Sequence, residues 1–407
     1  MNARYEKWIF TVAFMDLFAV SLVMPLMSTH LKSLGASHFL IGLFGSVYSG
    51  VQLFSGPVVG SWSDIRGRRV ALLFTQLVCC LCYFSIGFVN ALWVVFLLRV
   101  VIGLLKHTQS LCKALVADVV TPERQPAAGS RLASFSGMGF MVGPALGGVL
   151  FEREGGFTVV CSIVAALFLL SAGISCFLLP SGPAQQRRQE DGGAGGFMPA
   201  KHELVRAATE LASVDWTRYW DVFAHKFLSS VAMMSFFMHC GLILTERYGT
   251  SQSWVGYTIS FQGSVSVAAG FLLAWLDRFY ARDERCNLRT LHGFAVLALS
   301  FALLGCAPNL GAFLAALVPL SAASSLLRLA GNEVVIRRTP PDKRGSLVGA
   351  GNSVASIARL ISPLVAGVVY DTVGESGVFA CSIASAVGGA LLSCWLIRRE
   401  NKQRKHR

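Results

Sequence analysis

Ionisable side chains inside long apolar segments are the residues of this chain that could do chemistry. Asp16 stands in the middle of the first apolar segment, and Arg99, Lys106 and Lys113 follow one another at steps of seven in the fourth. A charge at mid-membrane depth costs about 2.5–3.5 kcal/mol, so it is kept where it faces water, a solute or an opposite charge. These positions therefore predict either a pathway for a solute or protons, or a salt bridge between helices.

The fourth segment carries the strongest predicted site. Steps of seven residues keep side chains on one face of a helix, with a drift of only about 20° per step. Lys113 is expected to extend its ammonium group to the aqueous surface, whereas two other polar residues fall near the centre of the segment. The predicted site residues on this segment are Arg99, Lys106, His107 and Ser110.

The second half of the chain carries a similar set of polar residues. Arg328 and Asn332 are four residues apart and therefore share one helix face, and Asn352, Ser356 and Arg359 follow at spacings of four and three. Arg359 fits a site and a pairing between helices equally well. Because basic side chains outnumber acidic ones at this depth, an organic anion or zwitterion is the predicted solute, although the family resemblance below also allows a cation.

Composition defines the class of protein. Of the 407 residues, 54% are hydrophobic and only 14% are charged, whereas soluble domains carry about 25% charged residues. The net charge of +13 does not indicate nucleic-acid binding, because the basic residues form short clusters between apolar segments. The chain is therefore predicted to be an all-α polytopic membrane protein.

Twelve segments are long enough to cross a bilayer core, which needs about 20 apolar residues of helix. Cytoplasmic loops are rich in Lys and Arg, and alternate connections hold 25 of these residues against three, which predicts both termini in the cytoplasm. The basic C-terminal tail is expected to lie against an anionic inner leaflet. The predicted spans are 8–30, 39–61, 70–89, 91–118, 127–150, 157–179, 220–244, 253–276, 288–306, 311–337, 345–369 and 376–397.

The two halves of the chain repeat each other. Placing Pro144 on Pro363 gives a constant offset of 219, which also places the acidic Glu152 on Asp371. Small residues at every fourth position allow two membrane helices to approach closely. The predicted packing residues of the first half are Gly139, Gly143, Pro144, Gly147 and Gly148. The predicted domains are a six-helix bundle over 1–180, a linker with a surface helix over 181–219, a second six-helix bundle over 220–397 and a basic tail over 398–407.

Three stretches resemble the major facilitator superfamily, in its antiporter and tetracycline-exporter-like branch. "GSWSDIRGRR" resembles the signature G-x-L-[AS]-D-R-x-G-R-[RK], although Trp62 and Ile65 replace the usual Leu and Arg. "GFMVGPALGG" resembles the fifth-helix signature of proton-driven antiporters, and "FMDLFAVSLVMPLMSTHLKSLG" is similar to the first helix of tetracycline exporters. The residues that match the first signature are Gly60, Asp64, Gly67, Arg68 and Arg69.

The resemblance implies roles for these residues. Asp64 and Arg68, across a turn at Gly67, would form a cytoplasmic gate with Asp118 of the fourth helix, held by charge-assisted hydrogen bonds. A plain cytoplasmic anchor is the alternative, and it would need only the arginines. Asp16 would bind a proton or a substrate amine, or else pair with Arg99.

The function predicted from the sequence is secondary active transport of a small organic solute by alternating access, coupled to protons. A uniporter of an organic anion and a non-transporting receptor or scaffold remain alternatives. Phosphate-binding loops, nucleophile elbows and metal-ligand spacings are missing from the sequence, so neither an enzyme nor a cofactor is expected. The predicted partners are the solute, protons and lipid, without nucleic acid, and the chain is expected to be a monomer.

Overall fold

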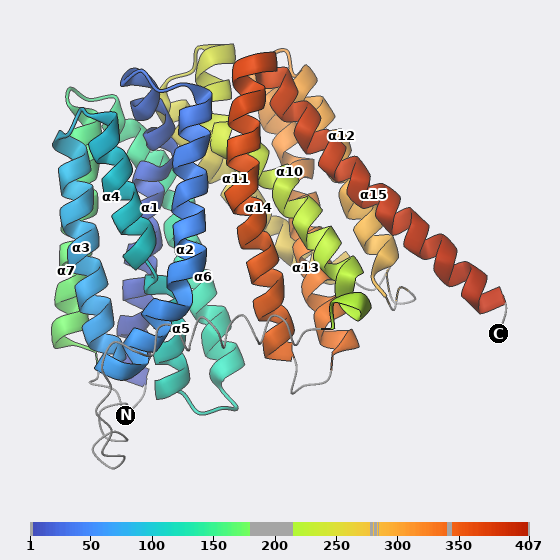
Figure 1. The fold of residues 1–407 in the computed structure, drawn as a ribbon, viewed down its shortest axis with the longest axis horizontal. Coiled ribbons are helices and arrows are strands. Elements are labelled where there is room, and N and C mark those ends of the chain that lie inside the picture. Colours follow the sequence, from blue (N-terminus) through green and yellow to red (C-terminus); the bar gives the residue numbers. More distant parts are fainter. Residues whose placement is uncertain are drawn as a thin grey trace. The chain divides into compact units, whose positions relative to one another are not determined.

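Helices make up all of the regular structure in the described part of the chain. The computed structural model describes residues 3–179, 215–276, 280, 283, 285–339 and 344–405, and these ranges contain no strand (Figure 1). The linker expected over 181–219, with its surface helix, falls almost wholly outside the described residues. The helices are α1 (Ala3–Ser33), α2 (His38–Arg66), α3 (Arg68–Phe88), α4 (Leu92–Leu105), α5 (Thr108–Val119), α6 (Gln125–Phe151), α7 (Gly156–Phe177), α10 (Trp216–Tyr248), α11 (Gln252–Leu276), α12 (Asn287–Cys306), α13 (Leu310–Arg338), α14 (Arg344–Val373) and α15 (Glu375–Lys405).

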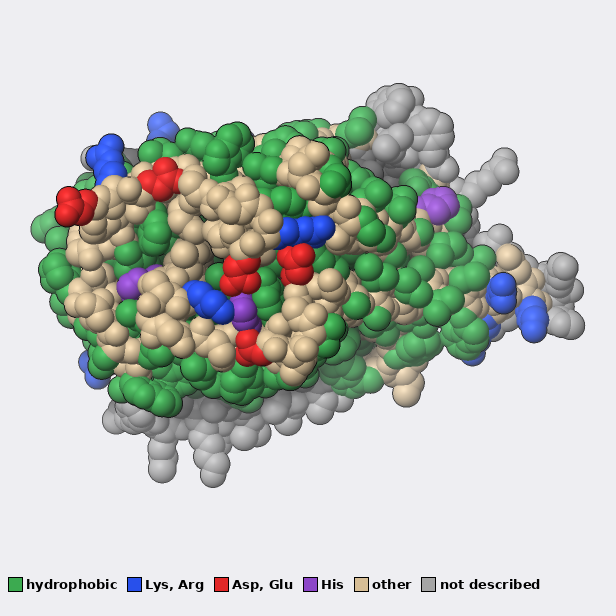
Figure 2. Space-filling view, turned by 90° about the horizontal axis from the view of Figure 1, so that it is seen from above, with side chains coloured by type: hydrophobic (Ala, Val, Ile, Leu, Met, Phe, Trp, Pro, Cys, Tyr) green, Lys and Arg blue, Asp and Glu red, His purple; other side chains and the backbone are tan. Residues whose placement is uncertain are grey.

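The helices have the length and composition of membrane spans. Among the described residues, eleven spans are long and apolar enough to cross a membrane, with α4 and α5 together forming one of them. Helix α11 occupies the position of the remaining expected span. Large apolar side chains such as Trp93, Phe177 and Phe271 are 78–83% exposed, and Figure 2 shows hydrophobic side chains over most of the periphery of the face it presents. Lipid tails would cover such a surface, so the all-α polytopic fold is confirmed.

The chain divides into two compact units. Among the described residues, the first unit contains 3–35, 47–179 and 250–260, and the second contains 36–46, 215–249 and the described residues from 261 onward. The start of α2 thus belongs to the second unit and the start of α11 to the first. The rest of each unit consists of helices from one half of the chain.

Small residues allow close helix packing in the first unit, where α6 lies against α1. A Cβ atom at Gly139 would lie 2.6 Å from Phe14 O, and Cβ atoms at Gly143 and Gly147 would overlap atoms of α1. Only glycine therefore fits at these positions without a shift of the helices. This packing fixes α1, and with it Asp16, against its neighbours.

Close packing at a glycine also occurs at the start of α11, which belongs to the first unit, and at the start of α2, which belongs to the second. In the first unit, a Cβ atom at Gly256 of α11 would overlap Pro144 O of α6. In the second unit, a Cβ atom at Gly42 of α2 would overlap Pro363 O of α14. The offset of 219 therefore relates two equivalent docking positions, each of which holds a helix start by backbone contact.

Candidate functional site

The fourth span is interrupted at its two central polar residues. Helix α4 ends at Leu105 and α5 begins at Thr108, with Lys106 and His107 in non-helical conformations between them (φ −76°, ψ 80° and φ −120°, ψ 24°). The span predicted over 91–118 is present, but its helix is interrupted, so the prediction of a single stripe of basic residues along one helix face is wrong. In membrane proteins, non-helical backbone at this depth is tolerated only where it is buried in protein or lines a cavity.

Helix α2 supplies the hydrogen bonds that the interruption requires. Gln52 Nε2 donates to Lys106 O at 2.9 Å, and Ser55 Oγ donates to Gly103 O at 3.3 Å. The His107 ring is buried, and its Nε2 lies 2.8 Å from Ser55 Oγ. Both predicted site residues at the break are thus held by polar contacts with a neighbouring helix.

Asp16 and Lys106 form a buried ion pair. Lys106 Nζ lies 3.0 Å from Asp16 Oδ1 and donates to Oδ2 at 3.1 Å, and the two side chains are only 6% and 1% exposed. Gln109 Nε2 donates to Asp16 Oδ2 at 3.0 Å, and Ser136 Oγ donates to Gln109 Oε1 at 2.9 Å. Residues of α1, the break, α5 and α6 thus form one polar network around the Asp16 side chain. Sequence reasoning missed Gln109 and Ser136, whose only signal was their polarity within apolar segments.

Arg99 is not the partner of Asp16 in this structure. Its guanidinium carbon lies 4.7 Å from the centre of the Tyr48 ring, a cation–π distance. Within the described ranges, its Nε atom is buried without a hydrogen-bond partner. Ser110 and Lys113 are exposed on α5. The three basic residues of the predicted stripe therefore have different surroundings: Arg99 lies over Tyr48, Lys106 is buried and Lys113 is exposed.

Arg68 joins three helices at the signature stretch. It forms an ion pair with Asp64, and its Nε donates to Asp118 Oδ2 at 3.2 Å on α5. Its Nη1 also donates to Ser63 Oγ at 2.6 Å. The chain turns between α2 and α3 at Gly67, whose φ of 95° is a conformation that favours glycine.

The remaining residues of the signature also have defined surroundings. Arg69 donates to the backbone carbonyl of Cys176 on α7, and Gly60 O accepts from Ser63 Oγ at 2.6 Å. The structure therefore brings Asp64, Arg68 and Asp118 together, whereas Arg69 binds separately to the backbone of α7.

The second unit contains a cavity of about 320 Å³ that is lined by residues of α10, α12, α13 and α14. The cavity is lined by both polar and apolar side chains, including the flexible side chains of Met233 and Met234. Among its lining residues are Lys226 and three of the residues predicted from the sequence, Arg328, Asn332 and Asn352. Arg359 is not among the lining residues; it donates to Ser356 Oγ at 2.7 Å.

Two basic side chains of this cavity have neutral hydrogen-bond partners. Lys226 Nζ donates to Asn352 Oδ1 at 3.3 Å, and Arg328 Nη2 donates to Ser325 Oγ at 3.4 Å. By contrast, the lining residue Arg338 forms an ion pair with Asp221. The cavity therefore combines an apolar surface with two cations whose charges these neutral partners do not balance.

Known proteins resemble the chain over most of its length. A model of the Major Facilitator Superfamily matches residues 9–291 and 284–407. Human solute carrier family 67 member A1 is 25% identical over 88% of this chain and 83% of its own length. The class C tetracycline resistance protein of Escherichia coli is 24% identical over 88% of this chain and 87% of its own.

Solved structures share the fold. The human organic anion transporter MFSD10 (TETRAN) matches with a TM-score of 0.67 at 22% identity, over 96% of this chain and 99% of its own. The nucleoside transporter NupG, as a D323A mutant, matches with a TM-score of 0.74 at 13% identity, over 97% of this chain and 99% of its own. At these identities the likeness concerns the fold alone.

Proposed function

Because this chain belongs to the Major Facilitator Superfamily, a family of membrane transporters that are in general not enzymes, we propose that it is a proton-coupled secondary transporter of a small organic solute. Alternating access between two six-helix bundles is the proposed mechanism. Every second connection between spans is rich in Lys and Arg, which supports a cytoplasmic position for these connections and for both termini. The C-terminal end of α2, which carries Asp64, is one of the cytoplasmic ends in this assignment.

The observation that carries the proton coupling is the buried Asp16–Lys106 pair at an interrupted helix. Discontinuous helices place ion and substrate sites near the membrane midplane in many transporters. Protonation of Asp16 would neutralise its carboxylate and leave the Lys106 ammonium buried without an opposite charge. Because an uncompensated buried charge destabilises a protein by about 3–5 kcal/mol, the protonated state favours a rearrangement around the break.

The cavity of the second unit supports an anionic or zwitterionic solute. Lys226 and Arg328 have neutral partners there, so a carboxylate or similar acid group would find charge-assisted hydrogen bonds. Met233 and Met234 adapt to apolar bodies of different shape. The similar MFSD10 structure is named as that of an organic anion transporter, whereas the tetracycline resistance relative is named for a different compound.

The signature cluster of Asp64, Arg68 and Asp118 is proposed as the cytoplasmic gate. Arg68 is half-buried and contacts both carboxylates, so separating the ends of α2, α3 and α5 would break charge-assisted hydrogen bonds. In this proposal the ion pairs of Arg68 with Asp64 and Asp118 are present in the closed state, break when the gate opens and form again when it closes.

A transport assay with Asp16→Asn tests the coupling. In proteoliposomes, the wild type should accumulate an organic anion when a pH gradient is imposed, and should exchange labelled for unlabelled solute without one. The variant keeps an amide that can accept from Lys106, so exchange should persist while pH-driven accumulation is lost. Accumulation that survives unchanged would contradict the role of Asp16, and accumulation independent of pH in the wild type would indicate a uniporter.

A further inference from the structure

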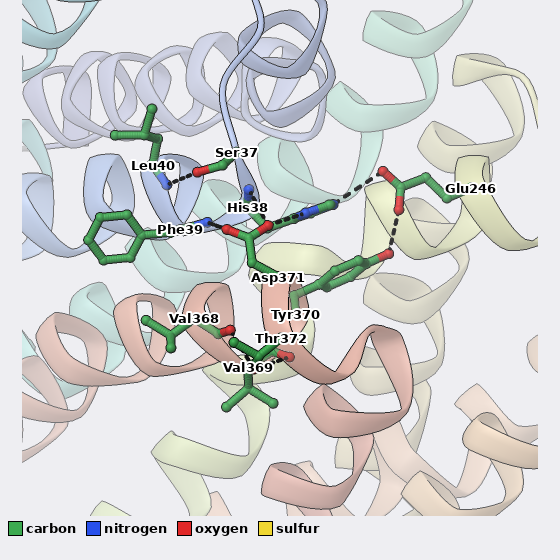
Figure 3. A network of polar contacts seen from close by, with 10 residues as sticks. All are labelled: Ser37, His38, Phe39, Leu40, Glu246, Val368, Val369, Tyr370, Asp371 and Thr372. Carbon is green, nitrogen blue, oxygen red and sulfur yellow. Dashed lines mark hydrogen bonds and ion pairs between the residues drawn. The ribbon is translucent and has the colours of Figure 1, made fainter.

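The start of α2 is held in the second unit by a carboxylate from α14 (Figure 3). Asp371 accepts hydrogen bonds from the backbone N–H groups of His38 at 3.1 Å and Phe39 at 2.8 Å, and Ser37 Oγ accepts from Leu40 N at 3.2 Å. These acceptors satisfy N–H groups that a helix start leaves without partners. The position of α2 in this unit therefore depends on Asp371.

The imidazole ring of His38 lies between two carboxylates. Its Nδ1 is 2.8 Å from Asp371 Oδ1, and its Nε2 is 3.2 Å from Glu246 Oε1 on α10. The ring of Tyr370 stacks on it at 3.9 Å between centroids, and the Tyr370 hydroxyl donates to Glu246 Oε2 at 2.7 Å. The His38 side chain is only 11% exposed, whereas the side chains of Asp371 and Glu246 are 31% and 38% exposed, so water has access to the acids.

This geometry requires one more proton than neutral imidazole carries. A neutral imidazole has one N–H donor, and an ionised carboxylate can only accept hydrogen bonds. Both ring nitrogens can bond to carboxylates only if the ring is doubly protonated or one carboxyl is protonated. We infer that His38, Glu246 and Asp371 form a proton-binding site that is complete only while the start of α2 is docked against α10 and α14.

The other charged groups around His38 do not remove this requirement. On α10, Arg247 lies next to Glu246 but forms an ion pair with Glu375 of α15 at 3.5 Å. His239, also on α10, has its ring 5.5 Å from that of Tyr370, and its Nδ1 lies 3.2 Å from Ser235 O. Two carboxylates thus face one imidazole ring, and neither of these neighbouring side chains replaces the second ring N–H donor that the geometry requires.

The first unit contains an equivalent helix start without a titratable ring. Glu152 at the end of α6 accepts from Ser253 N at 2.9 Å at the start of α11. The spacing that aligns Gly42 with Gly256 places Gln252 at the position of His38, and Gln252 Oε1 accepts from Thr29 Oγ1 at 3.3 Å. Hydrogen bonds from Ser251 and Ser253 hold the pKa of Glu152 below its ordinary value, so this carboxylate keeps its charge until the pH falls through that lowered pKa.

Hydrogen–deuterium exchange of the purified chain in nanodiscs tests the inference. Peptides covering residues 38–46 and 252–260 would be followed from about pH 5 to about pH 9, the range around histidine titration, after correction for intrinsic exchange. In the wild type, protection at the start of α2 should increase as pH falls, by up to about tenfold per pH unit for one linked proton. Protection at the start of α11 should stay constant.

Three variants identify the groups involved. His38→Gln installs the residue that the equivalent position already carries, and should abolish the pH response at α2. Glu246→Gln keeps a hydrogen-bonding side chain and allows a neutral imidazole, so α2 should stay docked at every pH even if His38→Gln folds poorly. Tyr370→Phe removes only the bond to Glu246 and should keep the pH response.

The result that would overturn the inference is a pH response that is missing in the wild type or retained in Glu246→Gln. The site is separate from the proposed proton site at Asp16, so Asp16→Asn should keep the full response at α2. A response lost in Asp16→Asn would contradict an independent site. Because the readout is local protection and not flux, failure of this site leaves the transport test of Asp16 unaffected.

Discussion

The fourth and tenth spans are counterparts in the repeat, yet they present their charges differently. The fourth span is interrupted between α4 and α5, and its Lys106 is buried against Asp16. The tenth span, α13, runs unbroken from Leu310 to Arg338, and its Arg328 is exposed at a cavity with a neutral partner. The same architecture thus holds a buried ion pair in one unit and an accessible cation in the other, and the proposed function assigns the proton to the first and the solute to the second.

Removal of Lys106 should have the largest effect, because it leaves the Asp16 carboxylate buried without its partner. Lys106→Met should lower the free energy of unfolding by about 3–5 kcal/mol, measured by denaturant titration in micelles. The loss should shrink as pH falls, because a lone Asp16 can take up a proton. Adding Asp16→Asn should restore most of the stability.

The matched control for this change is Lys113→Met, which removes an exposed lysine from α5. A surface substitution of this kind is expected to change stability by about 0.5 kcal/mol or less. Equal stability of the two methionine variants would mean that the buried pair contributes nothing.

A second comparison concerns the packing stripes of α6 and α14. A Cβ atom at Gly147 would overlap Leu22 O, whereas the aligned position in the second unit already carries Ala366. Gly147→Ala should therefore destabilise the protein by about 1–3 kcal/mol through overpacking. Gly137→Ala on the same helix, where nothing lies within 4 Å, should be neutral or slightly stabilising; similar losses in both variants would contradict close packing as the cause.

The accessible cations of the second unit should contribute to solute affinity. Lys226→Gln and Arg328→Gln should each weaken binding of an organic anion about ten- to a hundredfold, because a hydrogen bond to a charged group contributes about 1.5–3 kcal/mol. Scintillation-proximity binding would measure this, with Ser229→Ala, another lining residue, as the uncharged control. Preferential binding of organic cations by the wild type would contradict the proposed solute class.

Sequence reasoning found the spans and the buried charges because both depend on local composition. Asp16 and Lys106 stand out within apolar segments, and the Asp64–Arg68 pair lies within a short signature. The break at Lys106 was missed because no proline stands there and the nearest glycine, Gly103, lies three residues earlier within α4. It is stabilised by Gln52 and Ser55 of another helix, and such contacts cannot be read from the segment itself.

Contacts between residues far apart in the chain could not be predicted from the sequence either. His38 and Asp371 are 333 residues apart, and only the alignment of Glu152 with Asp371 hinted that the two acids play equivalent parts. The offset of 219 aligned the two acids, Glu152 and Asp371. It did not align the helix starts that these acids contact, because Gly42 and Gly256 are separated by a different number of residues. Tertiary structure was therefore needed to show why one docking position carries histidine and the other glutamine.

Infrared difference spectroscopy on the reconstituted protein tests the central claim, that Asp16 changes protonation when solute binds. The structure places this carboxylate 3.0 Å from the Lys106 ammonium group, and in the proposed coupling the negative charge of an anionic solute promotes proton uptake. Binding of solute to the wild type should therefore produce a new band in the protonated-carboxyl region, and that band should be missing in Asp16→Asn. A band of equal size in the variant, or none in a wild type that binds solute, would contradict the account.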